Sequence, residues 1–422
     1  MAEQHEKALV PQIRFAGFTD PWEQRKLGEL FEEHSEKDRD DLPALTIIQG
    51  GGTVHRDESN RNLQFDRNSL SNYKVVDTGD FIVHLRSFEG GLEKATCCGL
   101  VSPAYHIFRG KNVDSDFYYL YFRSKRFIDA DLKPHVYGIR DGRSIDIEGM
   151  KTIFIPWTNL AEQRRIGAFF DRLDSLITLH QRKYDKLCVL KKSMLDKMFP
   201  KGGSLYPEIR FAGFTDPWEQ RKLGEVARRV TRKNENGDSD LPLTISAQYG
   251  LVDQRTFFNS QVASKDMSGY FLLHRGEFAY NKSTSTDSPW GAIKRLEKYD
   301  MGCVSTLYIC FELLSGDPDF LVTYYETDRW YKSVQLIAAE GARNHGLLNI
   351  APDDFFETQI CIPKRIDEQR RIGAFFDRLD SLITLHQRKY DGCANPLFLE
   401  RRISCRKPSH QNRCSATTTP SG

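Results

Sequence analysis

The chain has 422 residues, a length that exceeds one ordinary domain and favours two or three. Hydrophobic residues make up 39% and charged residues 28%, which is the composition of a globular protein and excludes a fibrous or largely disordered chain. The 60 basic and 58 acidic residues nearly cancel to a net charge of +2, so a site for a polyanion must be a local patch.

Cysteine usage and the N-terminus both indicate a cytoplasmic protein. The nine cysteines are scattered without a CxxC pair, so neither a zinc ribbon nor a disulfide framework can be read, and a reducing compartment is expected. Residues 1–10 form an N-terminal extension without the apolar core of a signal peptide. We therefore expect no membrane partner.

Two long segments occur twice. The stretch "IRFAGFTDPWEQRKLGE" at Ile13–Glu29 recurs letter for letter at Ile209–Glu225, which is 209 − 13 = 196 residues later. The stretch "EQRRIGAFFDRLDSLITLHQRKYD" at Glu162–Asp185 recurs at Glu368–Asp391, which is 368 − 162 = 206 residues later. Different sequence lies between the copies, so the chain is interpreted as a tandem duplication of one unit whose middle has diverged.

Each diverged segment is predicted to be rich in strands. The stretch "VVDTGDFIVHLRS" from Val75 resembles "LLHRGEFAYNKST" from Leu272, and both alternate apolar residues between turn-forming residues. An apolar strand that contains a proline, "KTIFIPW" or "TQICIPK", precedes each copy of the second repeat. Each half is therefore predicted to be a mixed domain that leads into a helix.

The second repeat is predicted to be that helix. From Glu162 to Met198, apolar residues recur three or four positions apart and form one stripe. At 1.5 Å per residue such a helix is about 55 Å long, and its copy is the obvious partner for the stripe. The residues predicted to pack between the helices are Ile166, Phe169, Leu173, Ile177, Leu187 and Met194 in the first copy and Ile372, Phe375, Leu379 and Ile383 in the second.

The identity of the two copies ends abruptly at Asp391. The first copy continues with the helical pattern "KLCVLKKSMLDKMF", whereas the second continues with Gly392, Pro396 and Pro408, which are predicted to stop the helix. The tail is predicted to be largely disordered, and the change indicates a frameshift or a recombination junction. The apolar residues of the first helix that are expected to lack partners as a result are Leu187, Met194 and Met198.

Known catalytic motifs are absent from the sequence. It contains no GxxxxGK[ST] phosphate loop, no HExxH, no GxSxG, no GxGxxG and no Asn/Asp-Pro-Pro-aromatic element. The stretch "QGGGT" at Gln49–Thr53 is predicted to be a turn, and Cys405, His410 and Cys414 lack a fourth ligand for a metal. We expect no catalytic residue, metal or cofactor in this chain.

Together, the paired motifs in this order resemble the specificity (S) subunit of a type I restriction-modification enzyme, over Pro11–Asp391. The resemblance implies an α+β fold with two tandem strand-rich target recognition domains, separated by long helices that pack as an antiparallel coiled coil. It implies that each domain reads half of a bipartite, asymmetric double-stranded DNA target. Methyltransferase and restriction/translocase subunits would be the partners, and S-adenosylmethionine and ATP would act only there. Identical flanks would let recombination exchange a recognition domain.

The residues predicted to contact DNA lie in polar segments that are bounded by glycine. Arginine can pair with both guanine acceptors and asparagine with both adenine groups, so these residue types suit base recognition. The alternative for each residue is an ordinary solvated turn. The candidates are Arg86, Ser87, Tyr137, Arg140 and Arg143 in the first half and Lys282, Ser283, Thr284, Arg343, Asn344 and His345 in the second.

Three interpretations remain open at this stage. The first is a non-catalytic DNA-recognition subunit that docks methyltransferase and restriction subunits, the second a truncated or frameshifted remnant that folds but assembles poorly, and the third a free-standing methyltransferase or nuclease, which the missing motifs disfavour. The predicted segments are the extension at 1–10, recognition domains at 11–158 and 206–364, helices at 159–205 and 365–391, and the tail at 392–422.

Overall fold

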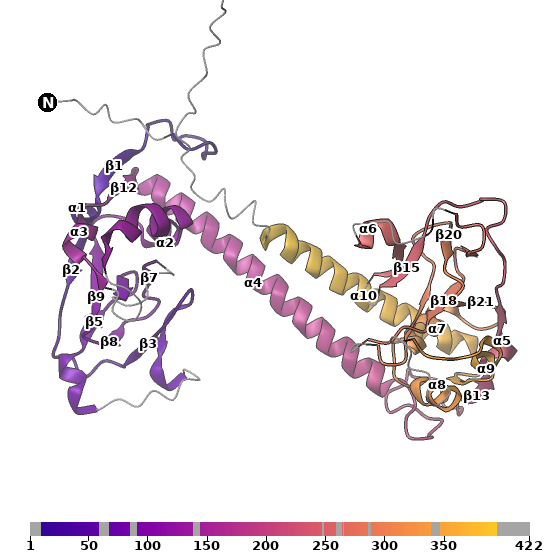
Figure 1. Ribbon diagram of the computed structural model, residues 1–422. Helices are drawn as coiled ribbons and strands as arrows, with labels where there is room; N and C mark the ends of the chain where they lie inside the picture. The colour runs from indigo at the N-terminus through magenta and orange to yellow at the C-terminus, as the bar shows by residue number, and fades with distance from the viewer. Residues whose placement is uncertain are drawn as a thin grey trace, which may run out of the picture. The chain divides into compact units, whose positions relative to one another are not determined.

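The structure is a computed structural model that describes residues 10–58, 67–84, 91–137, 144–246, 249–258, 264, 266–285, 288–338 and 347–394. The chain divides into two compact units (Figure 1). The first comprises Met1–Leu179 and Lys389–Gly422, and the second comprises His180–Arg388. Each unit combines antiparallel strands with part of a long helix. The fold is therefore α+β, as the sequence predicts.

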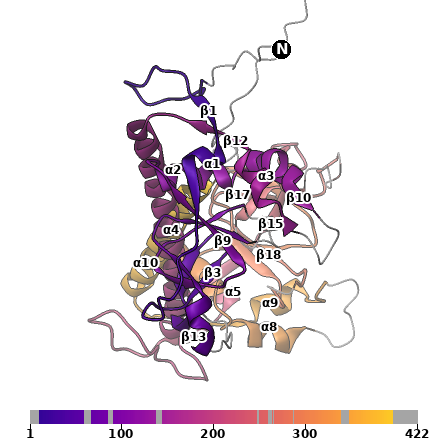
Figure 2. The same cartoon turned by 90° about the vertical axis from the view of Figure 1, so that its left-hand side faces the viewer.

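In the first unit, a four-stranded antiparallel sheet has the order β2-β9-β6-β7, and β3 with β4, β5 with β8, β10 with β11 and β1 with β12 form smaller pairs. Figure 2 turns this unit toward the viewer, with β1 and β12 beside α1. Its strands and helices are β1 (Glu23–Lys26), α1 (Leu27–Leu30), β2 (Phe31–His34), β3 (Leu45–Ile48), β4 (Gly52–His55), β5 (Lys74–Val76), β6 (Phe81–His84), β7 (Glu93–Lys94), β8 (Gly99–Val101), β9 (Tyr105–Gly110), α2 (Ser115–Phe122), β10 (Val136–Tyr137), β11 (Ser144–Ile145), α3 (Ile147–Lys151) and β12 (Phe154–Trp157).

The described residues of the second unit repeat this topology except for the β10–β11 pair. Its four-stranded sheet has the order β14-β21-β18-β19, and β15 with β16, β17 with β20 and β13 with β22 form the smaller antiparallel pairs. The shared strand order shows that the diverged halves kept one fold. Its elements are β13 (Glu219–Lys222), α5 (Leu223–Val226), β14 (Ala227–Arg229), β15 (Leu243–Ser246), β16 (Gly250–Asp253), α6 (Gln254–Phe258), β17 (Phe271–His274), β18 (Phe278–Asn281), β19 (Ala292–Arg295), β20 (Met301–Val304), β21 (Ile309–Leu313), α7 (Pro318–Tyr325), α8 (Tyr331–Ile337), α9 (Pro352–Phe356) and β22 (Gln359–Ile362).

Aromatic residues of one short helix build the core of each unit. In the first unit Asp114 caps the start of α2, and its Oδ1 accepts a hydrogen bond from the Phe117 N–H at 2.9 Å. The helix then places Phe117, Tyr118 and Phe122 in the core, where Phe122 meets the ring of Phe81 edge-on with centroids 4.9 Å apart. Such pairs contribute about 0.5–1.5 kcal/mol each beyond their buried area. In the second unit α7 supplies Phe320, Tyr324 and Tyr325 in the same way.

The two long helices are α4 (Leu160–Lys197) and α10 (Ile366–Ala394), and they pack against each other within the second unit. His180 Nδ1 lies 3.0 Å from His386 Nδ1, and Lys191 Nζ lies 2.6 Å from Asp380 Oδ1. Partner numbers fall along α10 as they rise along α4, so the helices are antiparallel, as predicted. Because 386 − 180 = 206, the two histidines occupy the same position of the repeat.

The prediction that the distal residues of α4 lack partners is wrong. Met198 is 3% exposed in the core of the second unit, and Leu187 and Met194 pack against that core. The end of the helix packs against the core of the second unit. The diverged segment that builds this core supplies contacts that the helix pattern alone could not predict. The described part of α10 also continues through Gly392 to Ala394, three residues beyond Asp391.

A difference in burial between the identical helices lies instead at their beginnings. Ile372, Phe376 and Leu379 of α10 are buried in the second core, at 2%, 1% and 6% exposed. Their copies in α4, which are Ile166, Phe170 and Leu173, are only half-buried. Identical sequence with different burial shows that the surroundings differ. Met198 and Phe199, which directly follow α4, belong to the cluster that buries the α10 stripe.

The "QGGGT" stretch forms the predicted turn, between β3 and β4. Gly50 and Gly52 have φ values of 78° and 73°, in the left-handed region that glycine adopts without a steric penalty. Their backbone N–H groups donate to the two carboxylate oxygens of Glu93, at 2.8 and 3.1 Å. The turn therefore binds a side chain of the same domain.

Candidate nucleic-acid interface

The candidate interface consists of two variable domains and the joints that hold them. We define the first variable domain as residues 30–161, the second as residues 226–367, and the lead-ins as Ile13–Glu29 and Ile209–Glu225. Each variable domain lies between a copied lead-in and a copied helix, and the copied segments contact each other directly. The joints are therefore constant while the domains differ.

The lead-in is tied to the helix by one buried glutamate in each unit. Glu162 accepts from Arg14 Nε at 2.6 Å, from Arg14 Nη2 at 2.7 Å and from Trp22 Nε1 at 3.2 Å. Glu368 accepts from Arg210 and Trp218 in the same way, at 2.6, 2.8 and 3.4 Å. Two parallel bonds from a guanidinium fix both distance and orientation.

Ionisation of Glu162 is maintained in spite of burial. Its side chain is 0% exposed. Burial disfavours the charged form, but the hydrogen bonds from Arg14 and Thr158 outweigh it and hold the pKa of Glu162 below its ordinary value. The joint is therefore a paired buried charge at neutral pH.

The glutamine that follows each glutamate binds backbone groups of the variable domain with its side chain. Gln163 Oε1 accepts from the Asp114 N–H at 2.9 Å, and its Nε2 donates to the Thr158 carbonyl at 2.6 Å. Gln369 makes the matching bonds to the Asp317 N–H, at 2.8 Å, and to the Pro363 carbonyl, at 2.8 Å. A bond to a backbone N–H does not depend on the side chain that the domain carries there, so the joint tolerates divergence.

A glycine in each helix lets the variable domain approach closely. A Cβ at Gly167 would lie 2.6 Å from Asp114 Oδ1 and 3.1 Å from the Phe117 nitrogen. A Cβ at Gly373 would lie 2.7 Å from Asp319 Cβ and 2.8 Å from the Phe320 nitrogen. The backbone at the start of α2 or α7 occupies the space that a side chain would need. The stretch "EQRRIG" thus joins the helix to the lead-in through its glutamate and to the variable domain through its glutamine and glycine.

We expect Gly373→Ala to destabilise the second unit by about 1–3 kcal/mol, because the new methyl group would overlap backbone atoms that cannot move aside. Gly392→Ala is the matched control on the same helix, since a Cβ there has nothing within 4 Å. That control should be neutral or stabilising by up to about 1 kcal/mol through helix propensity. Calorimetric unfolding of both variants tests this, and equal shifts would argue against the close approach.

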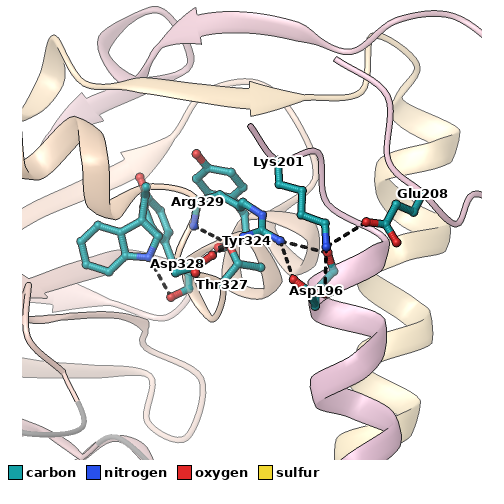
Figure 3. A network of polar contacts seen from close by, with 9 residues as sticks. Asp196, Lys201, Glu208, Tyr324, Thr327, Asp328 and Arg329 are labelled. Carbon is teal, nitrogen blue, oxygen red and sulfur yellow. Dashed lines mark hydrogen bonds and ion pairs between the residues drawn. The ribbon is translucent and has the colours of Figure 1, made fainter. Parts of the chain in front are cut away.

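The distal end of α4 is fixed to the second variable domain by a polar network (Figure 3). Arg329 Nη2 donates to the Asp196 carbonyl at 2.9 Å and contacts Asp196 Oδ1 at 3.1 Å. Lys201 Nζ, in the turn after the helix, lies 2.9 Å from Asp196 Oδ2 and 2.8 Å from Glu208 Oε1. The network closes the connection from α4 into the second lead-in.

In the first domain, one predicted DNA-contact residue lies among the described residues. Tyr137 ends β10, is 60% exposed and pairs with Ser144 of β11. Arg140 and Arg143 belong to residues 138–143, which join these two strands and lie outside the described residues, as do Arg86 and Ser87. Their assignment to DNA binding stays a prediction.

In the second domain the structure brings the borders of two predicted segments together. Ser283 pairs with Leu347 in an isolated antiparallel bridge, and Ser283 and Thr284 are exposed. Lys282 donates from Nζ to the Ile350 carbonyl at 3.3 Å, and burial lowers its pKa. This contact favours a supporting role for Lys282. Arg343, Asn344 and His345 lie outside the described residues and stay predictions.

Sequence reasoning missed the joint residues Glu162, Gln163 and Gly167, to which it assigned no role. Their signal is their place at the beginning of a copied segment, where charged and polar residues precede the apolar stripe. It also chose Phe375 for packing, whereas the adjacent Phe376 is the more buried, at 1% exposed. Phe169 is 46% exposed and packs edge-on against Phe15 of the lead-in, with centroids 5.7 Å apart.

The described ranges contain no candidate for two other kinds of site. Nowhere in them do three His, Cys, Asp or Glu side chains gather in a way that could hold a metal ion. None of the helices there combines the length and the apolar composition that crossing a membrane requires.

Comparison with solved structures shows that the chain has the fold of type I restriction-modification S subunits. The S subunit from M. genitalium matches 96% of this chain and 100% of its own, with a TM-score of 0.55 and 13% sequence identity. The HsdS subunit from Thermoanaerobacter tengcongensis matches 90% of this chain and 96% of its own, with a TM-score of 0.43 and 15% identity. No protein-family model matches the sequence, and no curated protein does.

Proposed function

We propose that the chain is the DNA sequence-recognition subunit of a type I restriction-modification complex. The observation that carries the proposal is the construction of the two units: one fold and one joint occur twice, while the domains between the joints differ. A protein that reads one bipartite, asymmetric site needs two different recognition surfaces on one constant frame. The fold shared with the S subunit from M. genitalium supports this function.

Recognition of bases would depend on the polar segments that follow matched strands. In the first domain residues 85–90 follow β6. In the second, the exposed Ser283 and Thr284 follow Lys282 at the end of β18, which holds the same place in its sheet. Segments at the ends of strands can vary in sequence without disturbing the sheet, so specificity can change while the fold stays constant. Arg140 and Arg343 remain the proposed cationic contacts.

Catalysis would belong to partner subunits. We propose that methyltransferase and restriction/translocase subunits bind this chain, and that S-adenosylmethionine and ATP act in them. Apolar residues that α10 exposes in the second unit offer a docking surface, because Leu382 and Leu385 are 39% and 44% exposed. Their copies in α4, Leu176 and Leu179, are 42% and 45% exposed, so a partner that binds one helix can bind the other.

An observation also favours the second interpretation, a chain that folds but assembles poorly. The stripe residues Ile166, Phe170 and Leu173 are half-buried while their copies in α10 are buried. If the two long helices pack incompletely, the surface they offer to the partner subunits would be less stable and would bind them more weakly. Purified chain mixed with methyltransferase subunits separates the interpretations, because only a competent subunit forms a stable complex on size-exclusion chromatography.

We expect replacement of residues 30–161 by the matching domain of a related protein to change one half of the methylated DNA site and leave the other unchanged. Each domain folds on its own joint, so its partner domain should be unaffected. Long-read methylome sequencing of cells that express the chain with its methyltransferase subunits measures both halves. A shorter exchange of Val75–Phe108 would place its border inside β9, within the stretch that pairs with β2.

The matched control is replacement of residues 226–367, which should change the opposite half. A change in both halves after either exchange, or in neither, would contradict modular recognition. A chain that directs no methylation although it binds its partners would contradict the proposed function itself.

A further inference from the structure

The two variable domains carry opposite charges at one matched position. Helices α2 and α7 begin at matched caps, since the side chains of Asp114 and Asp317 both accept a backbone hydrogen bond at 2.9 Å. The residue that caps the other end is Arg123 for α2 and Glu326 for α7. Because 317 − 114 and 326 − 123 both equal 203, these cap residues correspond.

The adjacent strand carries the opposite charge in each domain. Lys94 of β7 forms an ion pair with Asp116, the second residue of α2. Arg295 of β19 forms one with Asp319, the second residue of α7, so Lys94 and Arg295 correspond. The residues that precede them are Glu93 and Lys294, so this second position is also reversed in charge.

Each domain pairs the two positions with each other. Arg123 Nη1 lies 2.9 Å from Glu93 Oε2 in the first domain, and Lys294 Nζ lies 3.7 Å from Glu326 Oε1 in the second. Both domains therefore contain this ion pair, but the positions of the cation and the anion are exchanged. In the first domain the polarity also serves the turn between β3 and β4, because Glu93 accepts from the Gly50 and Gly52 N–H groups.

The polarity matters to the helix that packs beside the second domain. Lys191 of α4 places Nζ 2.7 Å from Glu326 Oε2 and 2.6 Å from Asp380 Oδ1 of α10. The lysine side chain is only 17% exposed. Burial disfavours its charge, but Glu326 and Asp380 outweigh burial and raise its pKa. One partly buried cation thus joins both helices to the cap of α7.

We infer that Lys191 and Asp380 form a charge-selective docking surface for a variable domain with an acidic residue at the cap that Glu326 occupies. A domain with arginine at that cap, such as the first domain, would place a second cation beside Lys191 and would be disfavoured in the second position. The surface thereby sets which domains can occupy which end of the frame. This inference concerns docking within the chain and does not depend on what the domains bind.

The physical basis is the replacement of attraction by repulsion at a partly buried site. Two opposite charges near 3 Å stabilise a partly buried contact, whereas two like charges there repel and are poorly screened by salt. Removal of one partner from such a pair is strongly destabilising, because it leaves an unpaired charge behind. In such a domain the arginine would still pair with the glutamate of its own strand, but Lys191 would keep only Asp380 as an acidic partner and would lie beside a second cation.

The test exchanges the polarity inside the full chain. Lys294→Glu with Glu326→Arg reproduces in the second domain the glutamate–arginine pair of the first. In the Lys191 background this double change should lower the melting temperature of the second unit by roughly 5 °C or more. In a Lys191→Glu background the same double change should raise it, because arginine at position 326 then meets a carboxylate.

Lys192→Glu is the control, since it makes the same charge change at an exposed neighbour on the same helix. In the Lys192→Glu background, which retains Lys191, the double change should lower the melting temperature as much as it does in the otherwise unchanged chain. Equal shifts in the Lys191 and Lys191→Glu backgrounds, including failure of both chains to fold, would overturn the inference. DNA methylation need not be measured, so a wrong proposed function would leave this result unaffected.

Discussion

Glu162→Ala is expected to destabilise the first unit by about 3–5 kcal/mol, the largest loss from any single substitution considered for this protein. The change leaves the Arg14 guanidinium, 12% exposed, and the Trp22 indole N–H without their acceptor. Because the lead-in is held to α4 through these groups, it should detach from the helix. Differential scanning calorimetry should show one transition lowered by roughly 10 °C.

Two matched variants show whether the loss comes from the joint. Glu368→Ala removes the copy of the same carboxylate and should lower the transition of the second unit by a similar amount. Glu148→Ala removes an exposed glutamate of the first unit, with a side chain 81% exposed, and should change stability by less than about 1 kcal/mol. An effect of Glu162→Ala no larger than that of Glu148→Ala would mean that the ion pair does not hold the lead-in.

The effect should also depend on pH in a defined direction. The pKa of Glu162 is lower in the folded chain than in the unfolded chain, so its ionisation stabilises the fold. The contribution is fully present above the ordinary glutamate pKa, near 4.3, and is lost as the pH falls through the lower folded value. The difference in stability between the unchanged chain and Glu162→Gln should therefore shrink in acid.

Replacing residues 392–422 with the sequence of Lys186–Phe199 is expected to raise the melting temperature of the first unit by roughly 5 °C. The helices are antiparallel and His386 lies opposite His180, so position 392, six residues further, falls opposite position 180 − 6 = 174. The added helix would run along the half-buried residues Ile166, Phe170 and Leu173. It should bury them as Met198 and Phe199 help to bury their copies in the second unit.

The same graft should strengthen binding of the methyltransferase subunits, which size-exclusion chromatography or calorimetric titration can measure. Its control is a graft in which the copies of Met194, Met198 and Phe199 are serine. That version can extend the helix but cannot bury the stripe, so it should raise the melting temperature little. If the apolar graft changes neither stability nor assembly, Asp391 does not mark a defect in the chain.

Position 397 of the graft provides a further comparison, because it receives the copy of Lys191. Arg123 holds the cap position in the first domain, so a lysine at 397 would meet a like charge. A graft with glutamate at 397 should therefore stabilise the first unit more than a direct copy. The two grafts differ in one residue, and a higher melting temperature for the direct copy would argue against charge-selective docking.

Much of the architecture follows from the sequence because its determinants are local or repeated. The identical segments at Glu162–Asp185 and Glu368–Asp391 showed the duplication, and their spacing of apolar residues predicted both helices. Alternation around Val75 and Leu272 predicted strands, and the structure has strands at both places. Periodicity reports which face of an element is apolar, and this property needs no knowledge of the partner.

Only the tertiary structure decided what each face meets. Arg14 and Glu162 are 148 residues apart and Lys191 and Asp380 are 189 apart, so no local pattern could pair them. Ile166 and Ile372 lie in identical sequence yet differ in burial. Met198 is buried in the second core, although the helix pattern predicted that it would lack a partner. Free energies of burial and ion pairing depend on the atoms that surround a group, and in this chain those atoms come from the diverged segments and from the frame on which they dock.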